Sequence, residues 1–294
     1  MKAILFGQVA KNTDRPHIDN VINCLVSRGI QFALYSQYQQ SINEIGISYK
    51  SELSVSSYEE LKEFSPDVFI SLGGDGTILH AMTLIQDLEI PVLGVNLGRL
   101  GYLANAEKLK IERSIDQIIE GNYEVESRSM IFLKANREVF SDYPYALNDL
   151  TVLKRDNASM ILIHCSVNGE LLNSYWADGI IISTPTGSTS YSLSVGGPIM
   201  APNCNNFVIS AVAPHNLTVR PIVLSDDVEI KIQVEGRSDN YLVTLDSRHS
   251  TITEEDTLSI KKANHKAKFI VFKDNTFIQT LHKKLNWGSD KRNV

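Results

Sequence analysis

The sequence predicts two domains, an α/β domain followed by a β-rich domain. Strand-like and helix-like segments alternate over residues 1–122, whereas residues 123–294 consist mainly of short β-rich runs. The length of 294 residues also exceeds the usual size of a single domain. Because alternating strands and helices are typical of a mostly parallel sheet covered by helices, we expect such a sheet in the first domain. We expect layered sheets in the second.

Each element of the first domain follows from local periodicity. Four short apolar runs predict buried strands: "KAILFG" from residue 2, "IQFALY" from 30, "DVFISL" from 67 and "IPVLGV" from 90. Four segments between or after them have helical spacing of apolar residues: "HIDNVINCLVSRG" from 17, "SSYEELKEF" from 56, "GTILHAMTLIQDL" from 76 and "KLKIERSIDQIIEG" from 108. Gly29 and Pro66 are expected to end the first two of these helices.

The second domain reads as a succession of strands with one helical interruption near "GSTSYSLSVGG". The β-rich runs are 123–135, 147–155, 160–172, 179–184, 207–213, 228–236, 241–246, 250–263 and 266–274. Asn168-Gly169 predicts a tight hairpin. The tail "FIQTLHKKLNWGS" from Phe277 predicts a short amphipathic helix, which we expect to pack back on the first domain.

Composition excludes several classes of function. The net charge of −6 leaves no basic footprint for nucleic acid. No apolar run is long enough to span a bilayer, and "MKAILFG" is too short to be a signal peptide. Cys24, Cys165 and Cys204 are scattered and odd in number, with no metal-ligand spacing. We therefore expect a cytoplasmic protein with reduced cysteines and neither a nucleic-acid nor a membrane partner.

The segment "GGDGT", Gly73 to Thr77, lies where the third apolar run meets a helix. It satisfies neither the dinucleotide fingerprint G-x-G-x-x-G nor the P-loop pattern. Two interpretations remain. In the first it is an ordinary turn, because Gly and Asp tolerate unusual dihedral angles. In the second it is a phosphate turn, in which Asp75 takes a proton from an attacking hydroxyl or holds a metal ion.

Two further patterns concentrate polar groups at strand ends. Hydroxyl residues crowd the segment from Thr184 to Ser190 around a proline and a glycine. Such hydroxyls can bind ribose or phosphate oxygens, although helix capping also favours Ser and Thr. Asn148-Asp149 lies between strand-like runs. The pair is either a turn or, with its carboxylate at a strand end, a group that accepts hydrogen bonds from ribose hydroxyls.

Together, and in this order, these patterns resemble the NAD kinase family. The shared marks are "GGDGT", the Asn-acid pair and "DGIIISTPTGSTSYSLSVGGP" from Asp178, joined by "LGRLGYLA" (Leu97–Ala104) and "LDSRHSTI" (Leu245–Ile252). The resemblance covers roughly residues 68 to 250. It implies an N-terminal α/β, Rossmann-like domain with a mostly parallel sheet and a C-terminal β-rich domain. It also implies a site in the cleft between them.

The implied reaction transfers a phosphoryl group from ATP to the adenosine ribose 2′-hydroxyl of NAD, with a divalent cation, Mg²⁺ by expectation. By resemblance, Asp75 is the general base and Gly73, Gly74, Gly76 and Thr77 shape the phosphate turn. The residues expected to bind NAD are Asp75, Gly76, His80, Asn148, Asp149, Asp178, Thr189, Ser190, Tyr191, Ser192, Leu193, Ser194 and Ala213. The family usually forms dimers or tetramers, so a homodimer or homotetramer is expected.

The chain departs from the family pattern at four positions. Asp149 stands where Glu is more frequent, and Trp176 stands where many relatives carry a basic residue. Ser159 replaces His or Arg, and Arg248 replaces a neutral polar residue. Two alternatives stay open: a lipid or diacylglycerol kinase of the same superfamily, which shares only "GGDGT", and a non-catalytic module that senses NAD(P).

Overall fold

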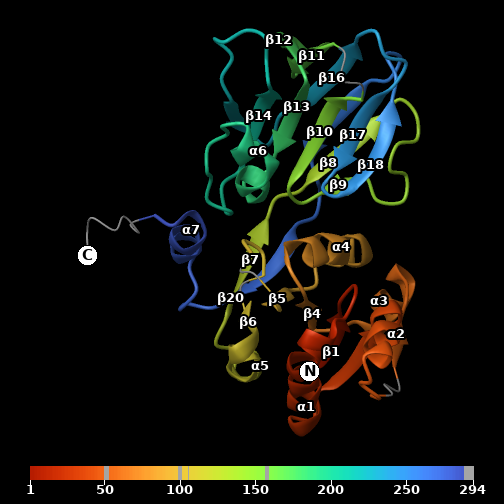
Figure 1. Cartoon of the computed structure of the whole chain (residues 1–294), viewed down its shortest axis with the longest axis vertical. Helices are drawn as coiled ribbons and strands as arrows, with labels where there is room; N and C mark the ends of the chain where they lie inside the picture. The colour runs from red at the N-terminus through yellow and green to blue at the C-terminus, as the bar shows by residue number, and fades with distance from the viewer. Residues whose placement is uncertain (50–52, 99–100, 105, 156–158, 288–294) are drawn as a thin grey trace. The chain divides into compact units, whose positions relative to one another are not determined.

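The computed structural model describes residues 1–49, 53–98, 101–104, 106–155 and 159–287. The chain divides into two compact units (Figure 1). Unit 1 comprises residues 1–127 and 267–294, and unit 2 comprises residues 128–266. Each unit has its own sheets and is described by itself.

Unit 1 is built on one sheet whose strand order is β3-β2-β1-β4-β5-β20-β7, with β6 paired to β5. The pairs from β3 to β20 along this path are parallel. The strands are β1 (Lys2–Phe6), β2 (Gln31–Tyr35), β3 (Ser54–Val55), β4 (Val68–Leu72), β5 (Val92–Asn96), β6 (Ala106–Glu107), β7 (Glu124–Arg128) and β20 (Ala267–Val271). Every residue of β4 and β5 is buried, which explains why these strands appear in the sequence as continuous apolar runs.

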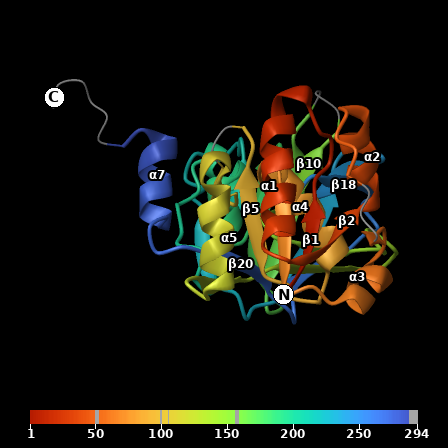
Figure 2. The ribbon, with the colours of Figure 1, turned by 90° about the horizontal axis from the view of Figure 1, so that it is seen from below.

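Helices accompany this sheet, and α1 lies beside α5 (Figure 2), while α3 contacts α4. Their bounds are α1 (Arg15–Ser27), α2 (Ser36–Glu44), α3 (Tyr58–Phe64), α4 (Asp75–Ile85), α5 (Ile111–Ile119) and α7 (Phe277–Leu285), with 3₁₀ turns η1 (Asn12–Asp14) and η2 (Lys108–Lys110). A capping box formed by Thr276 and Gln279 begins α7. Lys283 of α7 forms an ion pair with Glu107, and Lys284 lies over the ring of Tyr102.

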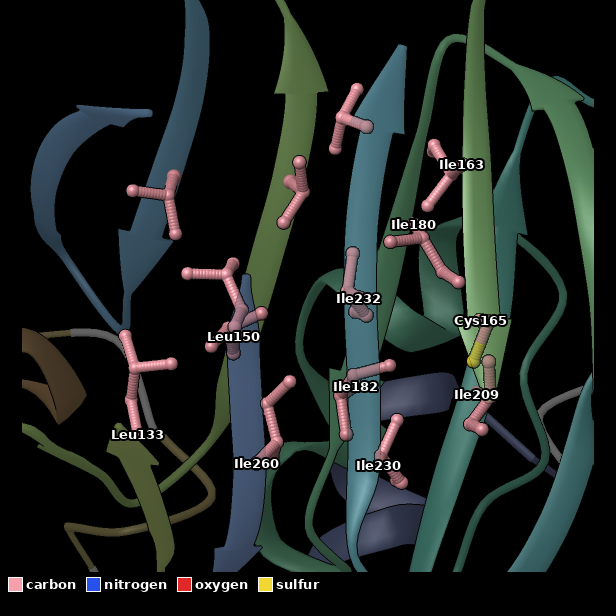
Figure 3. Packing of buried hydrophobic residues seen from close by; sticks show 14 of the residues in the cluster. Leu133, Leu150, Ile163, Cys165, Ile180, Ile182, Ile209, Ile230, Ile232 and Ile260 are labelled. Carbon is pink, nitrogen blue, oxygen red and sulfur yellow. The ribbon is translucent and has the colours of Figure 1, made fainter. Parts of the chain in front are cut away.

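Unit 2 contains two antiparallel sheets. One has the order β15-β14-β13-β10-β17-β18 and the other β12-β11-β16-β19-β8-β9. Their strands are β8 (Ile131–Ala135), β9 (Tyr145–Ala146), β10 (Asp149–Lys154), β11 (Ile161–Val167), β12 (Glu170–Ala177), β13 (Gly179–Ser183), β14 (Asn206–Val212), β15 (Ile222–Ser225), β16 (Ile230–Glu235), β17 (Tyr241–Leu245), β18 (Arg248–Ile252) and β19 (Leu258–Lys262). Ile180 and Ile182 of the first sheet share one apolar core with Ile163 and Ile232 of the second (Figure 3).

The structure confirms the predicted combination of an α/β unit and a β-rich unit, but it assigns two strands differently. The run 123–135 is two strands, and the first of them, β7, belongs to the sheet of unit 1. Likewise β20, which we placed in the β-rich domain 123–294, pairs in parallel with β5 of unit 1. The local pattern marks a strand but not its partner, so these two assignments were wrong. Among the described residues, no helix is both long and apolar enough to cross a membrane.

Candidate functional site

In unit 1, the chain turns sharply between β4 and α4 at Gly73-Gly74, and the helix begins at Asp75. A Cβ atom at Gly73 would lie 2.2 Å from Thr77 Oγ1, so only glycine allows the turn to close on the helix. In contrast, a Cβ at Gly74 or Gly76 would meet nothing within 4 Å. These two glycines therefore keep the surface above the helix N-terminus open rather than serving the packing of the turn.

The carboxylate of Asp75 is held by the loop that follows β5. Its Oδ1 accepts hydrogen bonds from the backbone N–H groups of Leu103 and Ala104, at 3.0 and 3.1 Å, and its Oδ2 accepts one from Tyr102 at 2.7 Å. A Cβ at Gly101 would lie 1.8 Å from Asp75 Oδ1. The segments "GGDGT" and "LGRLGYLA" are thus joined through the carboxylate of Asp75. Residues 99 and 100 of this loop lie outside the described residues.

His80 lies on α4, near the end of β1. Its Nδ1 is 3.2 Å from Gln8 Nε2, and its ring is 5.8 Å from that of Phe6. Burial lowers the pKa of the imidazole, so His80 is neutral at physiological pH. A neutral, half-buried ring with a polar neighbour can contact a ligand through its second nitrogen.

In unit 2, Asn148 and Asp149 stand at the start of β10, and a second aspartate holds them there. Asp246 occupies the turn between β17 and β18 with φ of +53°, a left-handed conformation that Asp tolerates better than most residues. Its carboxylate accepts hydrogen bonds from the backbone N–H groups of Leu147, Asn148 and Asp149 at 2.9, 2.7 and 3.3 Å. Asp246 is therefore a positioning residue for the Asn-acid pair.

The hydroxyl-rich segment packs directly on the same pair. Thr184 donates its backbone N–H to the Asn148 carbonyl at 2.9 Å and its hydroxyl to the Leu147 carbonyl at 2.5 Å. A Cβ at Gly187 would lie 2.0 Å from the Asn148 carbonyl oxygen, so glycine is required for this close approach. The two patterns that stand apart in the sequence thus form one structural group.

Some hydroxyls of this segment bond to the protein backbone, and others have no hydrogen-bond partner among the described residues. The segment forms a 3₁₀ turn, η3 (Thr186–Thr189), and one short helix, α6 (Tyr191–Ser194), and neither has a side-chain N-cap. The Thr184 hydroxyl accepts a hydrogen bond from the backbone N–H of Gly187 at 3.1 Å, so capping accounts for one hydroxyl of the segment and leaves the others to be explained. Ser188 bridges to the backbone of Met200, but the buried hydroxyls of Thr186 and Ser192 have no hydrogen-bond partner among the described residues. Buried polar groups are rarely left unpaired in folded proteins, so these hydroxyls are candidates for ligand contacts.

The pKa of the Asp149 carboxyl lies well above its usual range. Burial, followed by the nearby charge of Asp246, raises its pKa to about 7, while a hydrogen bond from Ser190 opposes the shift. Its Oδ2 is buried and has no hydrogen-bond partner among the described residues. An acceptor of this kind suits the hydroxyl of a bound sugar, which would supply the missing donor.

The raised pKa of Asp149 has a consequence for stability. The folded protein keeps a proton that the unfolded chain, with an ordinary pKa of 3.8, releases at lower pH. Asp149 therefore lowers the free energy of unfolding as the pH rises from about 4 towards 7. Asp149→Asn removes this ionisable group. We therefore expect the free energy of unfolding of the variant, minus that of the parent, to be larger at pH 8.5 than at pH 5.5. Urea denaturation at both pH values measures this, with Asp227→Asn, at an exposed site, as control. An equal difference at the two pH values would contradict it.

Asp178 and Ala213 lie at the opposite end of the strands from Asn148-Asp149. Asp149 pairs with Ser183 at one end of β13, whereas Gly179 pairs with Val212 at the other. At the usual rise per residue of a strand, Asp178 and Ser183 are about 17 Å apart. The Asp178 carboxylate is paired with Lys154 Nζ at 2.7 Å, and Ala213 has a left-handed φ of +46°. Within one chain, then, Asp178 is remote from the Asn-acid pair.

All four positions at which the chain departs from the family pattern lie within the residues that the structure describes. Trp176 is 61% exposed and, together with Ser159, Met160, Leu162, His215, Glu235, Gly236 and Arg237, lines a pocket of about 540 Å³. Arg248 donates to the carbonyls of Tyr143 and Tyr145 and lies 4.9 Å from the Tyr143 ring centroid. Arg248 thus holds the chain before β10 from the inside of unit 2.

Asp246 is the functional candidate to which sequence reasoning gave no role. The motif "LDSRHSTI" drew attention to its position, but nothing local indicates that its carboxylate reaches the backbone of residues 147–149. The usable signal was an aspartate at the tip of a hairpin between two strand-like runs, where Asp commonly bonds to neighbouring backbone.

Two family domains match the chain. The ATP-NAD kinase N-terminal domain matches residues 11–123, and the ATP-NAD kinase C-terminal domain matches residues 147–272. Among curated proteins, the NAD kinase of Flavobacterium psychrophilum is 44% identical over 100% of both chains. The NAD kinase of Cytophaga hutchinsonii is 39% identical over 98% of this chain and 99% of its own.

Solved structures agree with this assignment. Yeast NADH kinase complexed with NADH superposes with a TM-score of 0.86 at 21% identity, over 100% of this chain and 90% of that one, which shows the fold alone. An NAD kinase from Archaeoglobus fulgidus in complex with ATP superposes with a TM-score of 0.76 at 25% identity, over 97% of this chain and 99% of that one. With both family domains present and relatives matched over their full length, the chain belongs to the ATP-NAD kinase family.

Proposed function

We propose that this protein is an NAD kinase, which transfers the γ-phosphoryl group of ATP to the adenosine ribose 2′-hydroxyl of NAD, giving ADP and NADP. The observation that carries the proposal is the full-length match to relatives named NAD kinase, at 39–44% identity. The buried and unpartnered Asp149 Oδ2 and Thr186 Oγ1 support it, because both lie in the group that would receive the adenosine ribose.

The family pattern assigns a role to residues of each unit. In unit 2, Asn148 and Asp149 hold the ribose hydroxyls, and the segment from Thr189 to Ser194 lines the dinucleotide site. In unit 1, the N-terminal dipole of α4 faces the phosphates, and Asp75 takes the proton from the 2′-hydroxyl as it attacks. Within the described residues, Asp75 Oδ2 accepts one backbone hydrogen bond, which leaves a lone pair for that proton.

The polar groups present suit a divalent cation that binds together with the phosphates of the nucleotide. The described residues contain no group of three or more His, Cys, Asp or Glu that could hold a metal ion by themselves. Magnesium usually binds through one or two carboxylates together with substrate phosphates. Asp75, and Asp14 of η1, are single carboxylates of that kind. When bound, the cation would neutralise charge on the phosphates.

Incubation with ATP and Mg²⁺ separates this function from its alternatives. The proposal predicts NADP when NAD is the acceptor and no product when diacylglycerol is. A lipid kinase gives the reverse result, and a non-catalytic sensor binds NAD in calorimetry without forming product. The buried, unpaired Cys24 and Cys165 support a cytoplasmic location for this activity.

The position of Asp178 supports an oligomer whose sites are completed by a neighbouring copy. Asp178, the residue before β13, is too far from Asp149 to share one ribose with it, yet the family pattern places both at NAD. In a homodimer or homotetramer, Asp178 of one copy could reach the ligand held by another. We expect inactive Asp75→Asn and inactive Asp178→Ala chains to regain activity when mixed and allowed to exchange subunits. If proven exchange restores nothing, each site is contained within one chain.

A further inference from the structure

The C-terminal helix α7 is anchored to other elements of unit 1. Within the helix, Leu281 is 4% exposed. Immediately before the helix, Asp274 Oδ2 lies 3.0 Å from Arg113 Nη2 of α5. In the last turn of the helix, Lys283 Nζ lies 3.7 Å from Glu107 Oε1 of β6. Because β6 follows shortly after the segment that holds Asp75, these contacts keep the end of α7 near that segment.

Lys284, the next residue of the helix, contacts this segment directly. Its Nζ lies 5.3 Å from the centroid of the Tyr102 ring, which is within the range of a cation–π interaction. Tyr102 also donates its backbone N–H to Asp75 Oδ2 at 2.7 Å, the shortest of the three backbone hydrogen bonds to this carboxylate among the described residues. A single residue, Tyr102, therefore joins the C-terminal helix to the carboxylate that we propose as the general base.

The other end of the segment 101–104 is fixed by the sheet. A Cβ at Gly94 of β5 would lie 2.8 Å from the Ala104 Cα and 3.1 Å from the Leu103 carbonyl oxygen, so glycine allows the segment to lie directly on the strand. The side chain of Tyr102, in contrast, is only half-buried. A cation above its ring therefore restrains the part of the segment that the sheet leaves free.

Resting on the proposed function, we infer that Lys284 is a positioning residue for the transfer step. Its ammonium holds the Tyr102 ring, and through the backbone N–H of Tyr102 it sets the direction of Asp75 Oδ2. Among the described residues, this oxygen accepts one backbone hydrogen bond, so it is the oxygen with a lone pair left for the proton of the attacking hydroxyl. Lys284 itself does not touch the reacting atoms.

Replacing Lys284 by glutamine removes the charge and keeps most of the length of the side chain. A cation over an aromatic ring near the surface changes an equilibrium about two- to fivefold. We expect Lys284→Gln to lower kcat by about this factor and to leave the KM for ATP and the KM for NAD within about twofold, because the direction of the carboxylate matters for proton transfer. Lys284→Arg keeps a cation above the ring and should match the parent. Lys273→Gln, at an exposed lysine of the same unit, makes the same change in charge and should also match the parent.

The same substitution in an Asp75→Asn background shows whether Lys284 acts through the carboxylate. Asparagine has no basic oxygen to direct, so adding Lys284→Gln should lower the remaining turnover no further. If Lys284 instead contacts the phosphates of a bound nucleotide, the loss persists in the Asp75→Asn background and the KM for ATP rises in Lys284→Gln. Either of these two results would overturn the inference.

Hydrogen exchange in the protein without substrates tests the contact independently of turnover. We expect the Tyr102 amide to exchange about two- to fivefold faster in Lys284→Gln than in the parent, and at the parent's rate in Lys284→Arg and Lys273→Gln. The amides of β4 should exchange equally in all four proteins. Equal rates for Tyr102 in the parent and Lys284→Gln would reject the inference. So would an increase that extends equally to β4, because it would indicate a general loss of stability.

The failure of this inference is distinct from the failure of the proposed function. If the parent protein makes no NADP, the proposed function is wrong whatever the variants do, and the exchange rates still decide whether α7 restrains Tyr102. If the parent makes NADP while Lys284→Gln retains both its kcat and its exchange rates, the proposed function stands and the positioning role of Lys284 is wrong.

Discussion

Replacing Asp75 by asparagine is expected to lower turnover about 100- to 10,000-fold while NAD still binds, because general-base catalysis contributes a factor of that size. A ribose hydroxyl is a weak nucleophile, and its proton must leave as the phosphoryl group is transferred. The asparagine side chain would keep the shape of the aspartate and one oxygen for the N–H groups of Leu103 and Ala104, but it cannot take the proton. Steady-state turnover, set beside calorimetric binding of NAD, is the measurement.

The control for this substitution is Asp87→Asn. Asp87 is also in unit 1 and bonds to the Tyr58 hydroxyl at the surface, so its loss tests whether removing any carboxylate from this unit slows the enzyme. We expect turnover of this variant to match the parent. If Asp75→Asn turns over within a few-fold of the parent, the carboxylate serves the loop at Tyr102–Ala104 and not the chemistry, and the ordinary-turn interpretation of "GGDGT" is right.

The second large effect is expected at the Asn-acid pair. Asp149→Ala should raise the KM for NAD by a factor of about ten or more and change the KM for ATP little, because a lost hydrogen bond to a charged group costs about 1.5–3 kcal/mol. The assay belongs at pH 8.5, since the pKa of Asp149 is raised to about 7 and the carboxylate is then ionised. Asn148→Ala should act in the same direction.

Asp227→Ala supplies the matched control, since Asp227 is an exposed aspartate of the same unit. Its KM for NAD should equal that of the parent. An Asp149→Ala variant with an unchanged KM for NAD would show that the unpartnered Oδ2 is not a ligand contact. An equal loss of affinity for both substrates would instead indicate a general disturbance of unit 2.

Much of the fold is readable from local patterns. The apolar runs at β1, β2, β4 and β5 and the helical spacing in α1 lie where periodicity predicts them, and Gly29 follows α1 with φ of +64°. The hairpin at Asn168-Gly169 has both residues in the left-handed region, as its dipeptide predicts. Helix α2 was missed because its polar sequence, "SQYQQSINE", buries only Tyr38 and Ile42 and has little apolar periodicity.

The candidate site is likewise only partly predictable from the sequence. Asp75, Asn148-Asp149 and the hydroxyl segment are recognisable because each concentrates polar groups beside a strand. Their connections are not recognisable, since the bonds from Asp246 to residues 147–149 span 97 to 99 positions of the chain and those to Asp75 span 27 to 29.

The proposed activity places a phosphoryl group on one particular hydroxyl of NAD, and the position of that group in the product can be measured. The protein is incubated with ATP, Mg²⁺ and NAD, the product is isolated, and its new phosphomonoester is located by phosphorus NMR with coupling to the ribose protons. We predict one new phosphate, coupled to the 2′ proton of the adenosine ribose. A phosphate on the 3′-hydroxyl or on the nicotinamide ribose, or NAD recovered unchanged, would contradict the proposed activity.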